Sequence, residues 1–141
     1  YQDEMQEAEA LYKKAIEVGG SPTTYEKLTN LYEKKNQPQK AIDNAASSLK
    51  LHKRNQINYQ IGKIAAEFDM EPELGLASLK QYIKNHSVKD GVPVSWAHFR
   101  MAQIYKNLGD KTRATHYINL ALADKPDFEQ ALEEKRRIEE L

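Results

Sequence analysis

Residues 25–45 read YEKLTNLYEKKNQPQKAIDNA, and residues 98–118 read HFRMAQIYKNLGDKTRATHYI. Both stretches place large apolar or aromatic residues at helical spacing, continue through a short polar segment, and resume with small and apolar residues. Apolar residues three and four positions apart lie on one face of an α-helix, whereas Pro38 and Gly109 mark interruptions between helices. Each stretch therefore predicts two antiparallel helices joined by a tight turn.

The same helical spacing extends through almost the whole chain, and no stretch alternates for long at the period of a strand. We predict an all-α chain of about eight helices. Their expected ranges are residues 2–18, 22–35, 38–51, 56–68, 72–85, 95–108, 111–124 and 127–141.

Residues that start and stop helices agree with these ranges. Pro22, Pro38 and Pro72 stand where the missing amide hydrogen costs nothing, at a first helical position. Left-handed residues are expected at helix ends at Gly19-Gly20, Asn36 and Gly109. The expected N-caps are Ser21, Asp110 and Asp127, the last forming a capping box with Gln130.

A repeat links the hairpins. Ala8, Ala41, Gly75 and Ala114 recur at intervals of 33, 34 and 39 residues, and the last interval contains the loop at residues 85–95. Small residues at these positions allow helices to approach closely, and large neighbours fill the space beside them. A weaker copy of the pattern runs through Asn58, Ile61, Gly62 and Ala65.

The pattern W-x2-L-G-x2-Y followed by A-x3-F, with a period of ~34 residues, is that of tetratricopeptide repeats. The chain resembles this family from about Ala8 to Phe128. The resemblance implies a superhelical array of antiparallel helix hairpins in one domain, residues 1–141. It divides into the second helix of an incomplete repeat (1–20), three repeats (21–55, 56–90 and 91–126) and a C-terminal capping helix (127–141), as expected for the C-terminal part of a longer repeat protein.

Composition excludes several kinds of site. Lys and Arg number 21, as do Asp and Glu, so no overall basic charge favours nucleic acid. The chain has no cysteine, which excludes disulfides and thiolate metal sites. No apolar run approaches the ~20 residues of a membrane-spanning helix. The sequence does not discriminate a cytoplasmic location from an exported one, since a signal peptide could have been removed from a chain that begins at Tyr1.

The resemblance implies that a protein or peptide binds to the concave face, which the first helix of each hairpin lines. Side chains of aromatic, amide and cationic character on these helices are typical of recognition surfaces. The predicted partner-binding residues are Asn30, Tyr59, Lys63, Trp96, Phe99, Arg100 and Gln103. The competing interpretation is that Tyr59, Trp96 and Phe99 pack between neighbouring helices.

One subset of the family holds the acidic tails of chaperones with a two-carboxylate clamp. Of the clamp pattern, only Asn30 and Arg100 match here, and Glu26 and Lys63 replace a lysine and an asparagine. Because a glutamate repels a carboxylate, the sequence disfavours a chaperone-tail ligand.

No pattern indicates catalysis. His52, His86, His98 and His116 have no metal-ligand spacing, and His98 takes a repeat position usually held by a packing residue. The pairs Glu7-Glu9, Glu133-Glu134 and Glu139-Glu140 are interpreted as solvated helix faces. We predict no enzyme activity, no cofactor and no metal site.

Two further features stay open. The loop at residues 85–95 is either a tolerated surface insertion or a segment whose Val92-Pro93-Val94 narrows the groove beside Trp96. Besides partner binding, the chain could serve as an accessory or docking domain of a larger enzyme or secretion component, or as a homo-oligomerisation module that pairs through its terminal helices.

Overall fold

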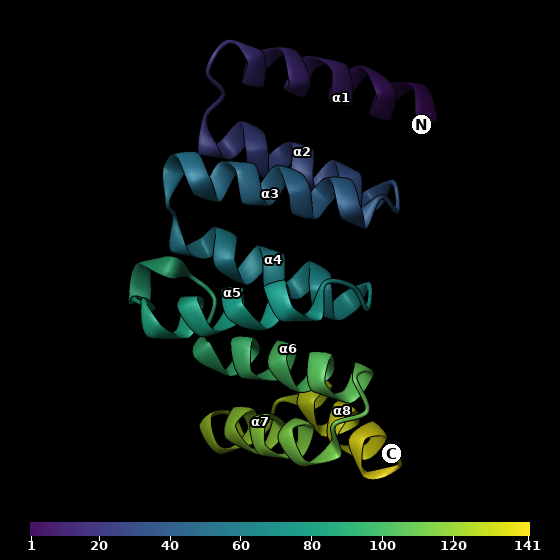
Figure 1. The fold of residues 1–141 in the computed structure, drawn as a ribbon, viewed down its shortest axis with the longest axis vertical. Helices are drawn as coiled ribbons and strands as arrows, with labels where there is room; N and C mark the ends of the chain where they lie inside the picture. The colour runs from purple at the N-terminus through teal and green to yellow at the C-terminus, as the bar shows by residue number, and fades with distance from the viewer.

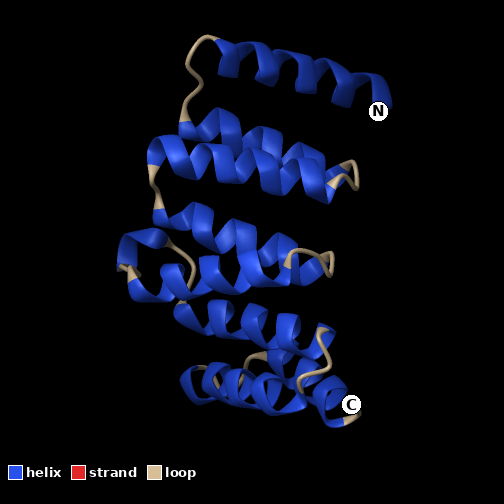
Figure 2. Cartoon of the chain, viewed as in Figure 1, coloured by secondary structure: helices blue, strands red, loops and turns tan.

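The computed structural model describes residues 1–141, and every regular element in it is helical (Figure 2). The helices stack in one elongated row, with the N-terminus at one end and the C-terminus at the other (Figure 1). The all-α prediction of eight helices is confirmed. They are α1 (Gln2–Glu17), α2 (Pro22–Lys34), α3 (Pro38–His52), α4 (Asn55–Glu67), α5 (Pro72–Lys84), α6 (Val94–Asn107), α7 (Lys111–Asp124) and α8 (Glu129–Glu139), with a short 3-10 helix, η1 (Val88–Asp90).

Most predicted helix starts are where the structure places them. Pro22, Pro38 and Pro72 are the first residues of α2, α3 and α5. The Ser21 side chain accepts a hydrogen bond from the backbone N–H of Thr24 at 3.2 Å, which satisfies one of the free donors of the first turn of α2.

The last helix starts differently from the prediction. Asp110 caps α7 as expected, because its carboxylate accepts a backbone hydrogen bond in the first turn at 3.0 Å. The capping box of Asp127 and Gln130 was wrong: α8 begins at Glu129, and its N-cap is Phe128 without any side-chain cap. Because the Phe128 ring is completely buried, packing rather than capping sets this boundary.

Glycines allow the hairpins to pack closely. A Cβ added at Gly75 of α5 would lie 2.5 Å from the Ala65 Cβ of α4 and 3.0 Å from the Ile104 Cδ1 of α6. At Gly62 of α4 an added Cβ would collide with the Leu79 side chain of α5. Gly62 and Gly75, two of the small positions of the repeat, therefore lie where neighbouring helices approach each other most closely.

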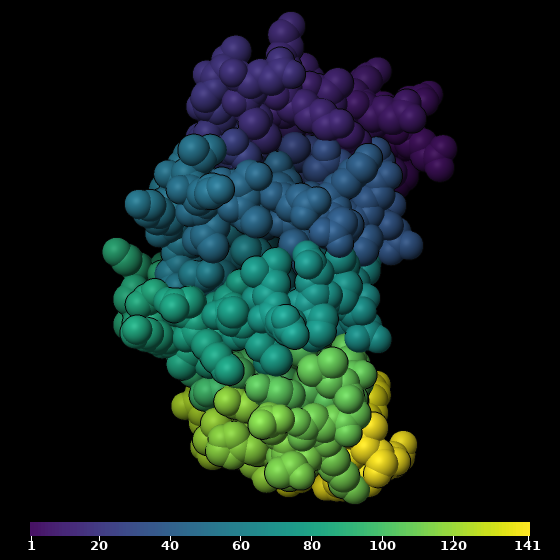
Figure 3. Space-filling model, viewed as in Figure 1, coloured from purple at the N-terminus to yellow at the C-terminus, as the bar shows by residue number.

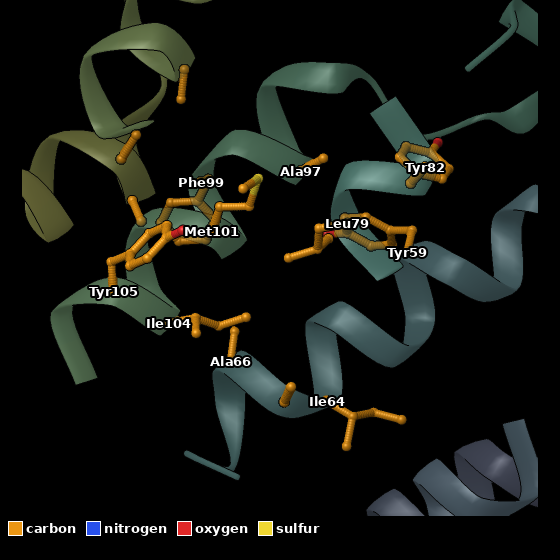
Figure 4. Packing of buried hydrophobic residues seen from close by; sticks show 14 of the residues in the cluster. Tyr59, Ile64, Ala66, Leu79, Tyr82, Ala97, Phe99, Met101, Ile104 and Tyr105 are labelled. Carbon is orange, nitrogen blue, oxygen red and sulfur yellow. The ribbon is translucent and has the colours of Figure 1, made fainter. Parts of the chain in front are cut away.

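One continuous apolar core joins the hairpins. Its 23 buried residues extend from α2 to α8, and Figure 4 shows how those around Leu79, Phe99 and Ile104 lie between α4, α5 and α6. A smaller cluster of Ala45 and Ile57 with Ile61 joins α3 to α4. Because the core crosses every hairpin boundary, each hairpin buries its apolar face only through its neighbours.

A buried carboxylate holds the capping helix. Glu134 is 1% exposed and lies against Lys106 of α6, and its second oxygen accepts from Arg137 at 3.0 Å. The interpretation of Glu133-Glu134 as a solvated pair was therefore wrong for Glu134. A buried charge is tolerated when it has an ionic partner and hydrogen bonds, and here both are present.

Helix α1 is the least attached element. It contains no buried residue, and only partly buried side chains such as Met5 and Tyr12 reach the core. Its polar attachment is Glu9, whose side chain is 14% exposed and lies 2.6 Å from Lys13 of the same helix and 2.6 Å from Lys35 at the end of α2. Glu9 therefore belongs to an interface, not to the solvated face predicted for it.

We expect Glu9→Gln to loosen α1 at neutral pH. Hydrogen bonds from Lys13, which has the larger effect, and from Lys35 lower the pKa of Glu9 from 4.5 to about 2. A lowered pKa in the folded state gives stability that is complete above pH 4.5 and is lost as the pH falls toward 2. After allowance for solvent screening, the variant should lose about 1 kcal/mol of α1 attachment at pH 7 and nothing near pH 2.

Hydrogen exchange measured for residues 2–17 at pH 7 checks this. Exchange in α1 should be several-fold faster in Glu9→Gln than in the parent and unchanged in α4. Glu17→Gln, at an exposed position of the same helix without an ion pair, is the control. Equal exchange in all three proteins would mean that Glu9 does not hold α1.

Candidate protein-binding face

The first helices of the three hairpins, α2, α4 and α6, are joined by side chains. Helix α4 packs directly on α6, whereas α2 meets α4 through polar side chains. Gln60 of α4 donates to the Asn30 side chain of α2 at 3.1 Å. Arg100 of α6 donates to the Tyr59 hydroxyl of α4 at 3.2 Å. The first helices therefore form one connected face, which we call the inner face.

A groove separates α2 from α4 on this face. It has a volume of about 360 Å³, within the range of small-molecule binding clefts. Its apolar surface comes from two aromatic and three aliphatic side chains: Tyr25, Ala45, Ile57, Tyr59 and Val92. Its polar surface comes from Thr23, Glu26, Thr29, Ser48, Arg54, Gln56, Gln60, Lys63 and Asp90, and Pro22 completes the lining.

The wall of the groove on the α2 side is fixed by hydrogen bonds. Thr29 is 1% exposed, and its hydroxyl donates to the Tyr25 carbonyl at 2.9 Å. The Asn44 amide of α3 donates to the same carbonyl and to the Thr29 hydroxyl, each at 2.9 Å. Because these buried polar groups are paired, the wall exists before any partner arrives.

The long loop between α5 and α6 forms the end of the groove. The Asp90 carboxylate accepts from the Asn55 amide at 3.1 Å and from the Ser87 backbone N–H at 2.8 Å. These hydrogen bonds lower the pKa of Asp90, and the bond from Asn55 has the larger effect. The Tyr82 hydroxyl donates to the Val92 carbonyl at 2.6 Å. The loop is thereby fastened at both ends to α4 and α5.

This placement shows which groove the loop contacts. Val92 does contact a groove, as the second interpretation required, so the loop is more than a surface insertion. The groove is the one between α2 and α4, however, and Trp96 is not among its lining residues. The hydrogen bonds of Asp90 and Val92 hold the loop against α4 and α5 at the end of this groove.

The structure divides the predicted binding residues into two groups. Tyr59 and Lys63 line the groove, and Asn30 borders it through its hydrogen bond with Gln60. Lys63 is not free: it lies 3.3 Å from Glu33 and 4.0 Å from Glu67. Its charge is therefore already balanced within the chain.

The second group surrounds Arg100 on α6. Its guanidinium lies 3.2 Å from Glu67 of α4 and donates to Gln103 at 3.1 Å. It also lies over the rings of Trp96 and Phe99, at 5.6 Å and 5.1 Å from their centroids. The guanidinium of Arg100, which the sequence analysis predicted to bind a partner, therefore makes its contacts within the chain.

The aromatic residues of this second group pack inside the molecule. Phe99 is 4% exposed, and the half-buried Trp96 ring lies 4.6 Å from the ring of Phe128. Tyr59, at 9% exposed, packs against the Tyr82 ring at 5.5 Å. Phe99 and Tyr59 are thus buried between helices, as the packing interpretation predicts. Trp96 is partly buried in this packing and partly exposed to solvent.

No titratable cluster suggests catalysis or metal binding. Burial lowers the pKa of the half-buried His98, whose ring packs beside Tyr117 at 6.1 Å. Nowhere do three His, Asp or Glu side chains converge on a point that could hold a metal ion. No helix has the length and apolar character needed to cross a lipid bilayer.

Comparison with known proteins identifies the architecture. No protein-family model and no curated protein matches the sequence. Among solved structures, MamA superposes with a TM-score of 0.79 at 20% identity, over 99% of this chain and 74% of MamA. YrrB, described as a TPR protein with an unusual peptide-binding site, superposes at 0.78 and 18% identity, over 96% of this chain and 68% of YrrB.

A third solved structure is also similar. A putative kinesin light chain of Podosopora anserina, with nearly identical TPR-like repeats, gives a TM-score of 0.69 at 11% identity, over 97% of this chain and 74% of that one. The sequence identities are low and the superpositions cover nearly the whole chain. The chain therefore has the tetratricopeptide repeat fold that its sequence pattern predicts.

Proposed function

We propose that this tetratricopeptide repeat chain is a non-enzymatic scaffold that binds a segment of another polypeptide in the groove between α2 and α4. The observation that carries the proposal is the groove itself, which combines apolar side chains with hydrogen-bonding groups at its edges. A peptide needs both, because its side chains gain from apolar burial and its backbone needs polar partners.

The groove is also preorganised. Thr29 and Asn44 fix one wall, and the hydrogen bonds of Asp90 and Val92 fix the loop at its end. A binding site that is already ordered loses less conformational entropy when its ligand arrives. This favours the groove over the Arg100 group, whose polar contacts are made within the chain.

The structural neighbours support the same class of function. YrrB is described as having a peptide-binding site, and this chain superposes on most of it. On the present proposal, the predicted contact residues Asn30, Tyr59 and Lys63 lie in or beside the groove. Trp96, Phe99, Arg100 and Gln103 support the inner face from α6.

Self-association is a second candidate because α1 presents apolar side chains to solvent. Leu11 of α1 is 68% exposed, Val18 directly after α1 is 83% exposed, and α1 forms one end of the stack (Figure 3). Two copies joined through α1 would cover these residues. Light scattering that gives the mass of one chain at high micromolar concentration would dismiss this arrangement. An accessory domain that docks a larger enzyme or secretion component would use the same groove.

Filling the groove tests the main proposal. Peptides selected from a random library against the immobilised chain should bind Gln56→Trp and Glu26→Trp at least tenfold more weakly than the parent, because an indole would occupy the space of the ligand. Fluorescence anisotropy of labelled peptides measures the affinity, and thermal unfolding verifies that both variants fold.

Two exposed positions outside the groove provide matched controls. Gln81→Trp on α5 and Lys27→Trp on α2 add the same side chain without lining the groove. They should leave peptide affinity within about twofold of the parent. Selected peptides that bind the groove-filled variants as tightly as the controls would refute this site.

A further inference from the structure

The groove continues into a second hollow of a different character. This hollow, of about 500 Å³, lies where the end of α3, the start of α4 and the α5–α6 loop meet. It has no apolar lining residue, and it shares Arg54, Gln56 and Asp90 with the groove. Its other lining residues are Lys53, Asn55, Asn85, Ser87 and Lys89. A ligand lying in the groove can therefore extend directly into a polar hollow.

Three cations line this hollow, and none has an ionic partner. Lys53, Arg54 and Lys89 are all exposed, and none of them forms a salt bridge or a side-chain hydrogen bond. We call them the basic shelf. On the inner face, by contrast, Lys63 and Arg100 are paired with glutamates. In a chain whose charges cancel overall, the shelf is a local excess of positive charge.

Asp90 is the single carboxylate in the hollow, and it does not neutralise the shelf. Its oxygens accept hydrogen bonds from Asn55 and from the Ser87 backbone, which hold it in the loop. Lys89 contributes only a weaker through-space attraction that lowers the pKa of Asp90. Three cations against one committed carboxylate leave a net positive charge facing solvent.

The start of α4 adds to this field. Its N-cap is Arg54, which supplies no side-chain cap, and its first turn contains no acidic residue. The N-terminal end of a helix carries a partial positive charge, which an acidic residue or a bound anion usually balances. Because α4 has no acidic residue in its first turn, this partial charge adds to the positive charge of the basic shelf.

We propose that the partner segment is a peptide in which apolar residues are followed by several carboxylates. This rests on the proposed function. The apolar residues lie in the groove against Tyr25, Ile57 and Val92, and the carboxylates lie on the basic shelf. The shelf is formed by the links between helices, so it is distinct from the inner-face positions at which chaperone-tail binders place their clamp.

The groove argues for a peptide and against a nucleic acid. Single-stranded nucleic acids bind through bases stacked on exposed aromatic rings beside a positive track. Tyr25 is 7% exposed and Tyr59 is 9% exposed, so neither ring offers a free face. An acidic peptide needs only apolar contact in the groove and charge on the shelf.

Three peptide pools test the assignment. Each pool has the same randomised seven-residue segment, followed by four aspartates, four asparagines or four lysines. We expect the full chain to retain the aspartate pool at least tenfold better than the asparagine pool, and to retain the lysine pool least. The preference should weaken steadily between 50 and 300 mM salt, because exposed charges are screened.

A charge-matched pair of variants locates the effect. The triple variant Lys53→Gln, Arg54→Gln, Lys89→Gln should lose the aspartate preference. The control triple Lys27→Gln, Lys34→Gln, Lys80→Gln has the same net charge, alters exposed lysines outside both hollows, and should keep the preference.

The outcomes separate the two proposals. If binding depends on the groove, as judged with Gln56→Trp, but all three tails bind equally, the acidic-tail assignment is wrong and the scaffold function stands. If no pool shows groove-dependent binding, the scaffold proposal itself fails. If oligothymidylate displaces the aspartate pool at equal charge concentration, the shelf is a general polyanion site and the peptide assignment is overturned.

Discussion

Phe128→Ala should lower the free energy of unfolding by about 3–5 kcal/mol, the range for truncating a fully buried aromatic residue. Phe128 is 0% exposed and precedes α8, and its ring lies 4.6 Å from Trp96 and 5.2 Å from Phe99. Its loss would leave a cavity at the point where α8 joins α6. Because capping does not fix the start of α8, the helix has no other local anchor there.

The single tryptophan makes this result directly measurable. Trp96 is the only tryptophan of the chain, so tryptophan fluorescence reports on the surroundings of this one ring, which contacts Phe128. Urea unfolding followed by fluorescence should show a lower midpoint, and the folded variant should emit at longer wavelength. Leu132→Ala, at a 43% exposed position of α8, should cost less than about 1 kcal/mol. Similar losses in both variants would mean that Phe128 does not anchor the helix.

Gly75→Ala should destabilise the protein by about 2 kcal/mol, although alanine favours helices by ~1 kcal/mol over glycine. The two effects oppose each other, and sterics decide. An added Cβ would lie 2.5 Å from the Ala65 Cβ, which has no rotamer to move away. Relief therefore requires α4 and α5 to separate, which disturbs the core around Leu79 and Ile104 (Figure 4).

A mutational cycle isolates the steric cost. Ala65→Gly removes the opposing atom, so Gly75→Ala should be much less destabilising in that background. Ala77→Gly, at an exposed position of α5, measures the helix-propensity difference in the same helix. Urea unfolding gives each free energy. A stabilising Gly75→Ala, equal and opposite to Ala77→Gly, would show that the close approach of the helices carries no cost.

Local rules explain why the fold was predictable. Pro22, Pro38 and Pro72 begin helices because of their own backbone chemistry, and Asn36 and Gly109 adopt the left-handed conformation at helix ends, with φ of 56° and 76°. The small repeat positions became close contacts because they recur at hairpin length. The start of α8 was missed because it depends on the burial of Phe128, a tertiary effect that no neighbouring residue signals.

The site was less predictable because its pairings are distant in sequence. Arg100 meets Tyr59 from 41 residues away, and Lys63 meets Glu33 from 30 residues away. Arg100 and Lys63, which the sequence predicted to be available to a partner, therefore make contacts within the chain. The basic shelf was missed for a similar reason: Lys53 and Lys89 belong to different links between helices, and the hydrogen bonds that fasten the α5–α6 loop to α4 and α5 bring them together.

The uneven attachment of α1 determines how the molecule would yield to tension between its ends. The contacts of α1 can be peeled away in succession, whereas the core from α2 to α8 resists as a single body. Stretching would thus release its 16 residues first, adding about 50 Å of extended chain. None of the side chains that form the groove belongs to α1, so the groove would keep its shape while the residues of α1 unfold and extend.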